Sequence, residues 1–282
     1  MKFGVNTQIW VAPFEQSDIG LIDKAAKLGF DVIELGFFSA EPPFSVDDVR
    51  QRLKDTGLTP GICTFLSADR DITSTDPEAR RCGVEFMKAM IRTLAKLGGE
   101  VFSGPIYAEL FRKRYLKKDE REAEWERGVK SLREIAKTAE TQGITLALEP
   151  LNRFETDFLN LSEQAVRMCE NVGSPAVGIL LDTFHMGIEE KNQGAAIRRA
   201  GKHLKHFHAC ENDRGTPGTG QVPWKEVREA LLDIGYDGIV AIEGFNPEIV
   251  DLANGACIWR PMAPTPDRLA GDGVQFLKKL FG

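Results

Sequence analysis

Four side chains able to bind a metal ion stand at the ends of successive apolar runs in the second half of the chain: Glu149, Asp182, His208 and Glu243. If those ends meet, three crowded carboxylates would repel one another unless a cation lies between them. Three oxygen ligands and one imidazole suit Mn²⁺, Mg²⁺ or Co²⁺ better than a closed thiolate zinc site. One such residue alone would be interpreted as a helix cap or an ion-pair partner. Four in order predict a site for one divalent ion.

A second group of polar residues follows the first at short offsets. Glu155, His185 and Arg214 lie six, three and six residues after the first three candidate ligands. Each alone would be taken as a surface residue. Their parallel placement indicates side chains that face a substrate bound at the metal.

Apolar runs and helical patterns alternate along the whole chain. The runs are short, as in a parallel sheet covered by helices on both faces. Eight of them are strand-like: Phe3–Ile9, Val32–Leu35, Leu58–Thr64, Val101–Pro105, Ile144–Glu149, Val177–Asp182, Leu204–Ala209 and Ile239–Glu243. A glycine lies close behind six of the helical patterns, where left-handed C-caps are common.

Eight βα units without a composition break predict an α/β fold, a single (β/α)8 TIM barrel forming one domain over residues 1–282. Closure of such a barrel brings the strand ends to one rim, where ligands bind. A doubly wound open sheet is the alternative. It would normally carry a nucleotide or flavin site, yet the first βα turn, Gln8–Pro13, has no glycine-rich phosphate loop.

Composition narrows the partners and the compartment. A net charge of −6 argues against a nucleic-acid binder. The five cysteines contain no Cys-x-x-Cys pair, which favours reduced thiols in a cytoplasmic protein. No signal-peptide segment precedes the first strand, and no apolar run approaches the roughly 20 residues of a membrane helix. We therefore expect a cytoplasmic protein without a nucleic-acid or membrane partner.

Several other residues have simpler interpretations. The charged run Phe111–Arg127 is expected to be a solvated helical face with its preceding loop. His206 is expected to be a hydrogen-bonded core histidine. Cys63 and Phe65 are candidates for a pocket wall. The glycine-rich segment 215–220 is interpreted as a flexible rim loop and not as a phosphate cradle.

Three segments carry a resemblance to a known family: Glu149–Glu155 (EPLNRFE), Leu181–Glu190 (LDTFHMGIEE) and His208–Gly215. They resemble the ketose 3-epimerases, which include the D-tagatose, D-allulose (psicose) and L-ribulose 3-epimerases, within the xylose-isomerase-like barrels. The resemblance extends over essentially the whole chain, including Asp71–Ser74 and Ile258–Arg260. The Asn-Arg-Phe-Glu and Leu-Asp-Thr-Phe-His pieces are specific, whereas the barrel frame alone is not.

This resemblance implies roles for the residues named above. One divalent ion, Mn²⁺ by preference with Co²⁺ or Mg²⁺ as alternatives, would be bound by the four strand-end residues. Glu155, His185 and Arg214 would bind the O1–O3 end of an open-chain ketose, and the backbone of Gly104 would lie against the sugar. The partner would be a small free ketose, and the assembly a homodimer or homotetramer.

The chemistry expected from this resemblance is inversion at C3 of a free ketose of the D-allulose/D-fructose, D-tagatose/D-sorbose or L-ribulose/L-xylulose type. A metal that polarises the C2 carbonyl would stabilise a cis-enediolate. Inversion needs a base on one face of C3 and an acid on the other. Glu149 and Glu243 are the predicted catalytic pair, one ionised and one protonated.

Other functions stay open at this point. The same site suits an aldose–ketose or hydroxypyruvate-type isomerase, which moves a proton between C1 and C2. A sugar-phosphate epimerase would need a phosphate clamp, and an abasic-site endonuclease would need histidines from several strands. A sugar-binding barrel without activity is a further alternative. Asn6 and Asp213 depart from the family pattern near the expected sugar site, so the preferred ketose stays open too.

Overall fold

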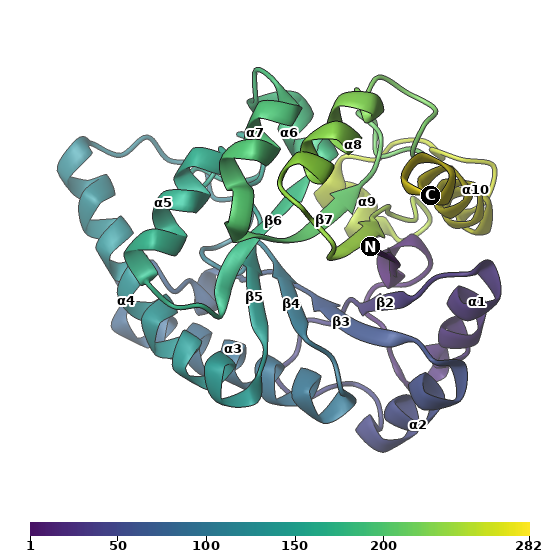
Figure 1. Ribbon diagram of the computed structural model, residues 1–282. Coiled ribbons are helices and arrows are strands. Elements are labelled where there is room, and N and C mark those ends of the chain that lie inside the picture. Colours follow the sequence, from purple (N-terminus) through teal and green to yellow (C-terminus); the bar gives the residue numbers. More distant parts are fainter.

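The computed structural model describes residues Met1–Gly282, and its strands close into a parallel barrel (Figure 1). The strands follow one another around the barrel in chain order, and the last pairs with the first. They are β1 Lys2–Asn6, β2 Val32–Leu35, β3 Thr59–Cys63, β4 Val101–Gly104, β5 Thr145–Leu148, β6 Val177–Asp182, β7 Leu204–Ala209 and β8 Ile239–Ile242. The closed order confirms the predicted TIM barrel and excludes the open doubly wound sheet.

Helices surround the barrel (Figure 1). They are α1 Gly20–Leu28, α2 Val46–Thr56, α3 Pro77–Leu97, α4 Lys118–Gln142, α5 Ser162–Val172, α6 Thr183–Glu189, α7 Gln193–Ala200, α8 Trp224–Asp233, α9 Val250–Ala256 and α10 Pro266–Phe281. The chain termini lie on the same side of the molecule, where the rings of Phe3 and Phe281 are 6.4 Å apart (Figure 1). No helix combines the length and hydropathy needed to span a lipid bilayer.

Glycine caps end the helices where the sequence predicts them. Gly173 closes α5 with a φ of 71°, a left-handed conformation that costs glycine little, and its N–H donates to the Cys169 carbonyl. The other five predicted caps also have positive φ: Gly29, Gly57, Gly98, Gly143 and Gly235. After each of these turns the chain continues to the next strand.

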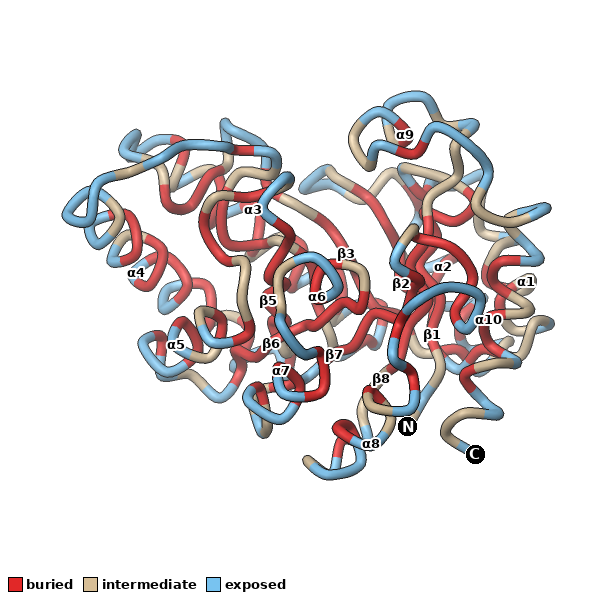
Figure 2. Tube along the Cα trace, turned by 90° about the horizontal axis from the view of Figure 1, so that it is seen from above, coloured by how far each residue is buried: buried red, intermediate tan, exposed pale blue.

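The core is continuous from the barrel to the inner faces of the helices. All six residues of β6 are buried, as expected for a strand covered on both sides. A single cluster joins 66 buried hydrophobic residues. Figure 2 shows this burial along the strands, with exposure on the outer surface. The barrel and the helices around it therefore share one contiguous core.

The charged run before α4 corrects one expectation. Arg112 and Glu124 were expected on a solvated face, but they are only 7% and 0% exposed. Arg112 pairs with Asp71, with Glu124 at 3.0 Å and with Asp157 at 3.1 Å. Burial is tolerated because each charge is compensated by opposite charges. The rest of the run around Lys118 is exposed, as predicted.

Candidate active site

The four predicted metal ligands converge at the carboxyl end of the barrel. Asp182 is the last residue of β6 and pairs in register with His208 of β7. Glu149 and Glu243 directly follow β5 and β8. One ligand atom from each of the four residues lies within 4.8 Å of the others, and all four residues are buried.

Two atoms of this cluster are buried without a hydrogen-bond partner. They are Glu149 Oε1 and His208 Nδ1, which lie 3.9 Å apart. Glu243 Oε1 lies 3.4 Å from the same Nδ1. Buried polar atoms in proteins nearly always have a bonding partner, and the chain supplies none for these two atoms. Carboxylate oxygens and one imidazole nitrogen converging at this point fit one divalent cation such as Mn²⁺, Co²⁺ or Mg²⁺.

Glu34 of β2 hydrogen-bonds to the ring nitrogen of His208 that does not face the cluster, and the sequence analysis did not identify it. Its carboxylate accepts hydrogen bonds from His206 Nε2 and, at 3.0 Å, from His208 Nε2. Burial would raise the pKa of Glu34, but the two histidines outweigh burial and lower it. Burial opposes a charge on His208, but Glu34 and Glu243 outweigh burial and raise the pKa of His208 well above its usual value. A cation that binds Nδ1 must therefore displace the proton there, while Glu34 keeps the proton on Nε2. The expectation of a hydrogen-bonded core histidine at His206 is confirmed.

Asp182 caps a helix and also contributes a negative charge to the cluster. Its Oδ1 accepts the Phe184 N–H at 2.7 Å and caps helix α6. Its Oδ2 accepts a hydrogen bond of 2.9 Å from Arg214 Nη1. Burial and the nearby charge of Glu243 raise the pKa of Asp182 to about 6, although Arg214 opposes the rise. Both sequence-based interpretations, cap and chemical group, therefore apply to this residue.

The surrounding charges shift the pKa values of the two predicted catalytic glutamates in opposite directions. Burial raises the pKa of Glu149 well above its usual range, and the negative charge of Glu243 adds to the rise. Burial acts on Glu243 too, but the positive charges of His208 and Arg214 outweigh it and lower the pKa of Glu243 to about 2. The protein's own charges thus favour a protonated Glu149 beside an ionised Glu243.

His185 presents a hydrogen-bond donor to the site. Its Nδ1 accepts the backbone N–H of Asn152 at 3.0 Å, so the proton of the neutral ring is on Nε2. Burial, with Arg214 nearby, lowers the pKa of His185 well below its usual value and keeps the ring neutral. Arg214 Nη2 lies 3.1 Å from Nε2. Two donors therefore converge where an acceptor oxygen of a substrate would fit.

Asn152 also positions Glu155, a role that the sequence did not indicate. The Asn152 amide donates to Glu155 Oε1 at 2.8 Å while its backbone holds His185. Burial raises the pKa of Glu155, and Arg214 opposes this rise. Two of the three predicted substrate-binding residues are thus linked through one asparagine.

Arg214 is held in place by charge and by aromatic rings. Nη1 donates to Asp182 and Glu243, and the guanidinium carbon lies 4.1 Å from the ring centre of Phe184 and 4.8 Å from that of Phe245. Its backbone is left-handed, with a φ of 66°. All three predicted substrate-binding side chains therefore line the same region as the carboxylates.

The loop after Arg214 is tied down by Glu211, another residue that the sequence analysis missed. Its buried carboxylate accepts hydrogen bonds from Gly218 N at 2.6 Å, Val222 N at 3.1 Å and Trp224 Nε1 at 2.6 Å. The loop was expected to be a flexible rim segment; instead, its Gly218 amide is bound by a carboxylate of the chain. A phosphate would compete with that carboxylate.

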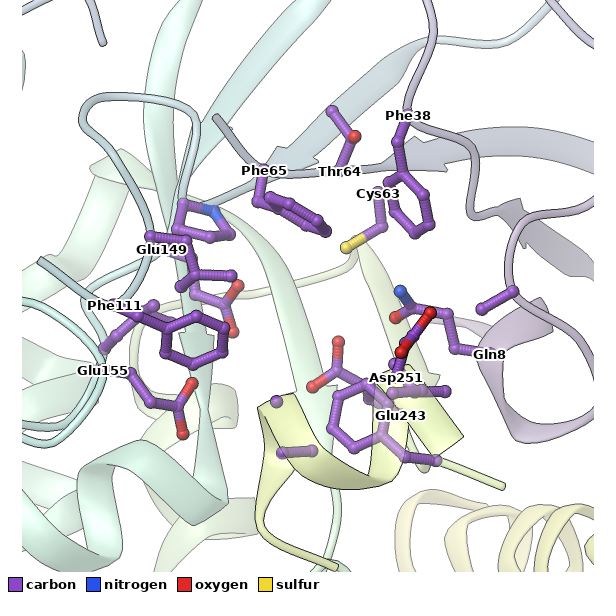
Figure 3. A pocket seen from close by; sticks show the side chains of 18 of the residues that line it. Gln8, Phe38, Cys63, Thr64, Phe65, Phe111, Glu149, Glu155, Glu243 and Asp251 are labelled. Atoms are coloured by element: carbon purple, nitrogen blue, oxygen red, sulfur yellow. The ribbon is translucent and has the colours of Figure 1, made fainter. Parts of the chain in front are cut away.

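A cavity of about 350 Å³ opens above the cluster (Figure 3). Polar side chains lie on two opposite sides of it, Glu149 and Glu155 on one and Gln8, Asp251 and Glu243 on the other, and phenylalanine and aliphatic side chains form much of the rest. The lining residues that concern the site are Gln8, Phe38, Cys63, Phe65, Pro105, Phe111, Glu149, Glu155, His185, Arg214, Glu243, Phe245, Asp251 and Leu252. Cys63 and Phe65 line the pocket, as the sequence suggested.

Three residues that the sequence analysis placed near the sugar do not line the cavity. Gly104 is buried at the end of β4 and does not line the cavity, whereas its neighbour Pro105 does. Asn6 does not line it, and its Oδ1 accepts the Gln8 N–H at 2.9 Å. Asp213 does not line it either and accepts the Gly215 N–H at 3.0 Å. Gln8, just beyond β1, does line the cavity.

Comparison with known proteins extends these observations. The profile of the xylose isomerase-like TIM barrels matches residues 22–280. The chain is 37% identical over 272 residues to D-psicose 3-epimerase of Ruminiclostridium cellulolyticum, covering 95% of this chain and 92% of that one. It is 35% identical over 264 residues to L-ribulose 3-epimerase of Mesorhizobium japonicum, covering 92% and 87%. The crystal structure of D-psicose 3-epimerase with D-tagatose from Clostridium cellulolyticum H10 matches with a TM-score of 0.91 at 33% identity, covering 100% and 99%.

Proposed function

Because this chain belongs to the xylose isomerase-like TIM barrels and, within them, to the ketose 3-epimerases, we propose that it inverts C3 of a free ketose with one bound divalent metal ion. The observation that carries this proposal is the convergence of Glu149, Asp182, His208 and Glu243 on one buried point, with ligand atoms that have no partner in the chain. The substrate would be of the D-allulose/D-fructose, D-tagatose/D-sorbose or L-ribulose/L-xylulose type.

Glu149, Asp182, His208 and Glu243 would hold the ion, Mn²⁺ by preference with Co²⁺ or Mg²⁺ as alternatives. When bound, the ion polarises the C2 carbonyl and stabilises the negative charge that develops as the C3 proton leaves. The three carboxylates and the Nδ1 atom of His208 supply a donor set of the hardness that these ions prefer.

The two glutamates would carry the proton transfers. The glutamate that is ionised would take the proton from C3 on one face, leaving the substrate as a cis-enediolate. The other, protonated, would then give its proton to C3 on the opposite face, which inverts the centre. In the reverse direction the two residues exchange roles.

The carbonyl end of the ketose would be bound by the second group of residues. The Nε2–H of neutral His185 and the guanidinium of Arg214 would donate to the oxygens beside the reacting carbon. Glu155, held by Asn152, would bind a neighbouring hydroxyl. These contacts fix C3 between the two glutamates, which is the positional part of catalysis.

The proposal also covers the oligomeric state of the protein and its cellular compartment. The family resemblance supports a homodimer or homotetramer, which light scattering after size-exclusion chromatography would measure. The five cysteines are all free, which is consistent with a reducing compartment such as the cytoplasm.

The test is product analysis in D₂O with metal-supplemented enzyme and a panel of free ketoses. We expect only the C3 epimer, carrying deuterium at C3. Glu149→Gln and Glu243→Gln should each lower C3 exchange by on the order of 10² or more, with the circular dichroism spectrum unchanged. Glu248→Gln, the same change at an exposed glutamate, is the control and should retain activity. An aldose product, or exchange retained in both site variants, would contradict the proposal.

A further inference from the structure

Gln8 places an unpaired amide in the wall of the cavity. The residue is only 6% exposed, and its side-chain amide forms no hydrogen bond within the chain. Its backbone is fixed, since its N–H donates to Asn6 Oδ1 at 2.9 Å and its carbonyl accepts the Asn246 N–H at 3.1 Å. Gly36 leaves room beside it, because a Cβ there would lie 3.1 Å from Gln8 Cγ. The amide of this nearly buried residue is therefore free to bind a ligand in the cavity.

Asp251 adds a second unpaired polar group to the same cavity. It is an exposed residue in the first turn of α9 that lines the cavity, and its carboxylate forms neither a hydrogen bond nor an ion pair within the chain, so it is available to a ligand there. The neighbouring wall is apolar, with Phe38, Phe245 and Leu252. Figure 3 shows Gln8 and Asp251 on one side of the cavity and Glu149 and Glu155 on the other.

The position of this pair sets which part of a substrate it would meet. If Glu155, His185 and Arg214 bind the carbonyl end, an open-chain ketose held over the cluster extends its far end toward Gln8 and Asp251. An amide both donates and accepts hydrogen bonds, whereas a carboxylate only accepts them. The pair therefore suits hydroxyl groups and disfavours a terminal phosphate, which carries like charge.

We propose that Gln8 and Asp251 form a distal hydroxyl subsite that selects six-carbon ketoses with a free terminal hydroxyl over terminal-deoxy and terminally phosphorylated ketoses. This inference rests on the proposed function for the direction of the substrate. Gln8 and Asp251 belong neither to the metal cluster nor to the group of Glu155, His185 and Arg214.

Gln8→Met tests the amide, since methionine has similar length and no comparable hydrogen-bonding group. For D-allulose we expect kcat/KM to fall about tenfold, mainly through KM. For 6-deoxy-D-allulose, which lacks the hydroxyl, the same variant should change kcat/KM by less than about twofold. An equal loss on both substrates, or no loss on D-allulose, would overturn the amide's assigned role.

Asp251→Asn tests the charge. The preference of the enzyme for D-allulose over its 6-phosphate should fall several-fold in this variant. Glu248→Gln removes the same charge three residues earlier; both residues are exposed, but Glu248 does not line this cavity. It should leave the preference unchanged. Equal effects in the two variants would mean that general charge, and not the subsite, sets the preference.

A binding measurement separates this inference from the proposed function. A hexitol and its 6-deoxy analogue have no carbonyl and are not turned over, so calorimetric titration of the metal-loaded protein reads the same hydroxyl without catalysis. We expect Gln8→Met to weaken hexitol binding about tenfold and to leave 6-deoxyhexitol binding unchanged. Equal binding of both polyols by the wild type would overturn the subsite even in an active epimerase. Discrimination between them in a protein without epimerase activity would overturn only the proposed function.

Discussion

His208 can serve as a metal ligand only if its Nδ1 atom carries no hydrogen. Glu34 determines which nitrogen keeps its proton when a metal binds, since its carboxylate accepts the Nε2–H at 3.0 Å and also binds His206. A carboxylate behind a ligating histidine fixes both the tautomer and the ring orientation. The residue behind the cluster therefore matters for metal binding although it does not touch the metal.

Glu34→Gln should weaken metal binding by about 10- to 100-fold. A glutamine offers one acceptor oxygen to two histidine donors and turns an N–H₂ group toward one of them. Mn²⁺ affinity measured by competition with a chelator is the readout. His206→Asn, which removes the other partner of Glu34, is the control and should change the affinity by less than about threefold. Unchanged affinity in Glu34→Gln would show that the carboxylate does not position His208.

The sequence predicts ligands better than it predicts their supports, and the reason is visible in single residues. Glu149 and Glu243 stand where an apolar run stops, so the pattern itself points to the rim. Glu34 lies inside its run, and its partners lie 172 and 174 residues away. Asn6 was expected near the sugar from the family resemblance, in a strand that continued to Ile9, but the chain turns into a 3-10 helix at Thr7–Ile9. That turn ends β1 and directs Gln8 to the cavity instead.

At the scale of strands and helices, spacing and caps were predictable because they depend on local chemistry. The charged segment before α4 was not, since charge density alone does not reveal whether partners lie in other loops. Asp71 and Asp157 come from such loops, and they make burial of Arg112 tolerable. Glu211 is a similar case, because the amides it binds are brought to it only by the folded loop.

The end of β4 depends on one glycine for its approach to β3. Gly104 has a φ of 118°, and a Cβ on it would lie 2.1 Å from the Thr64 carbonyl oxygen. Gly104→Ala should therefore lower the free energy of unfolding by about 2–5 kcal/mol, from backbone strain and overpacking together. Urea unfolding measures this. Gly20→Ala is the matched control, because a Cβ at the start of α1 meets nothing within 4 Å, and its stability should be equal or higher. Equal stability of both variants would contradict the close packing at β4.

For the whole barrel, the cluster joins the four strands from β5 to β8 at one point. Three carboxylates and one imidazole lie at these strand ends, and two of their buried atoms have no hydrogen-bond partner. The residues are Glu149, Asp182, His208 and Glu243. A ligand that binds the folded state alone stabilises it by about 2.7 kcal/mol at one hundred times its Kd. For a chain of this size each kcal/mol corresponds to about 2–4 °C in Tm.

Removal of the metal should therefore lower Tm by roughly 5–10 °C, and re-addition of Mn²⁺ should restore it. Differential scanning calorimetry of the protein with and without EDTA measures the shift. In Asp182→Asn the shift should shrink, because one charged ligand is lost, whereas in Glu248→Gln it should stay at the wild-type value. The physical reason is mass action: the ion pairs with atoms that only the closed barrel brings together, so it favours closure over the unfolded chain. A Tm that is independent of EDTA and Mn²⁺ would mean that these strand ends do not bind an ion, and the proposed chemistry would lose its Lewis acid.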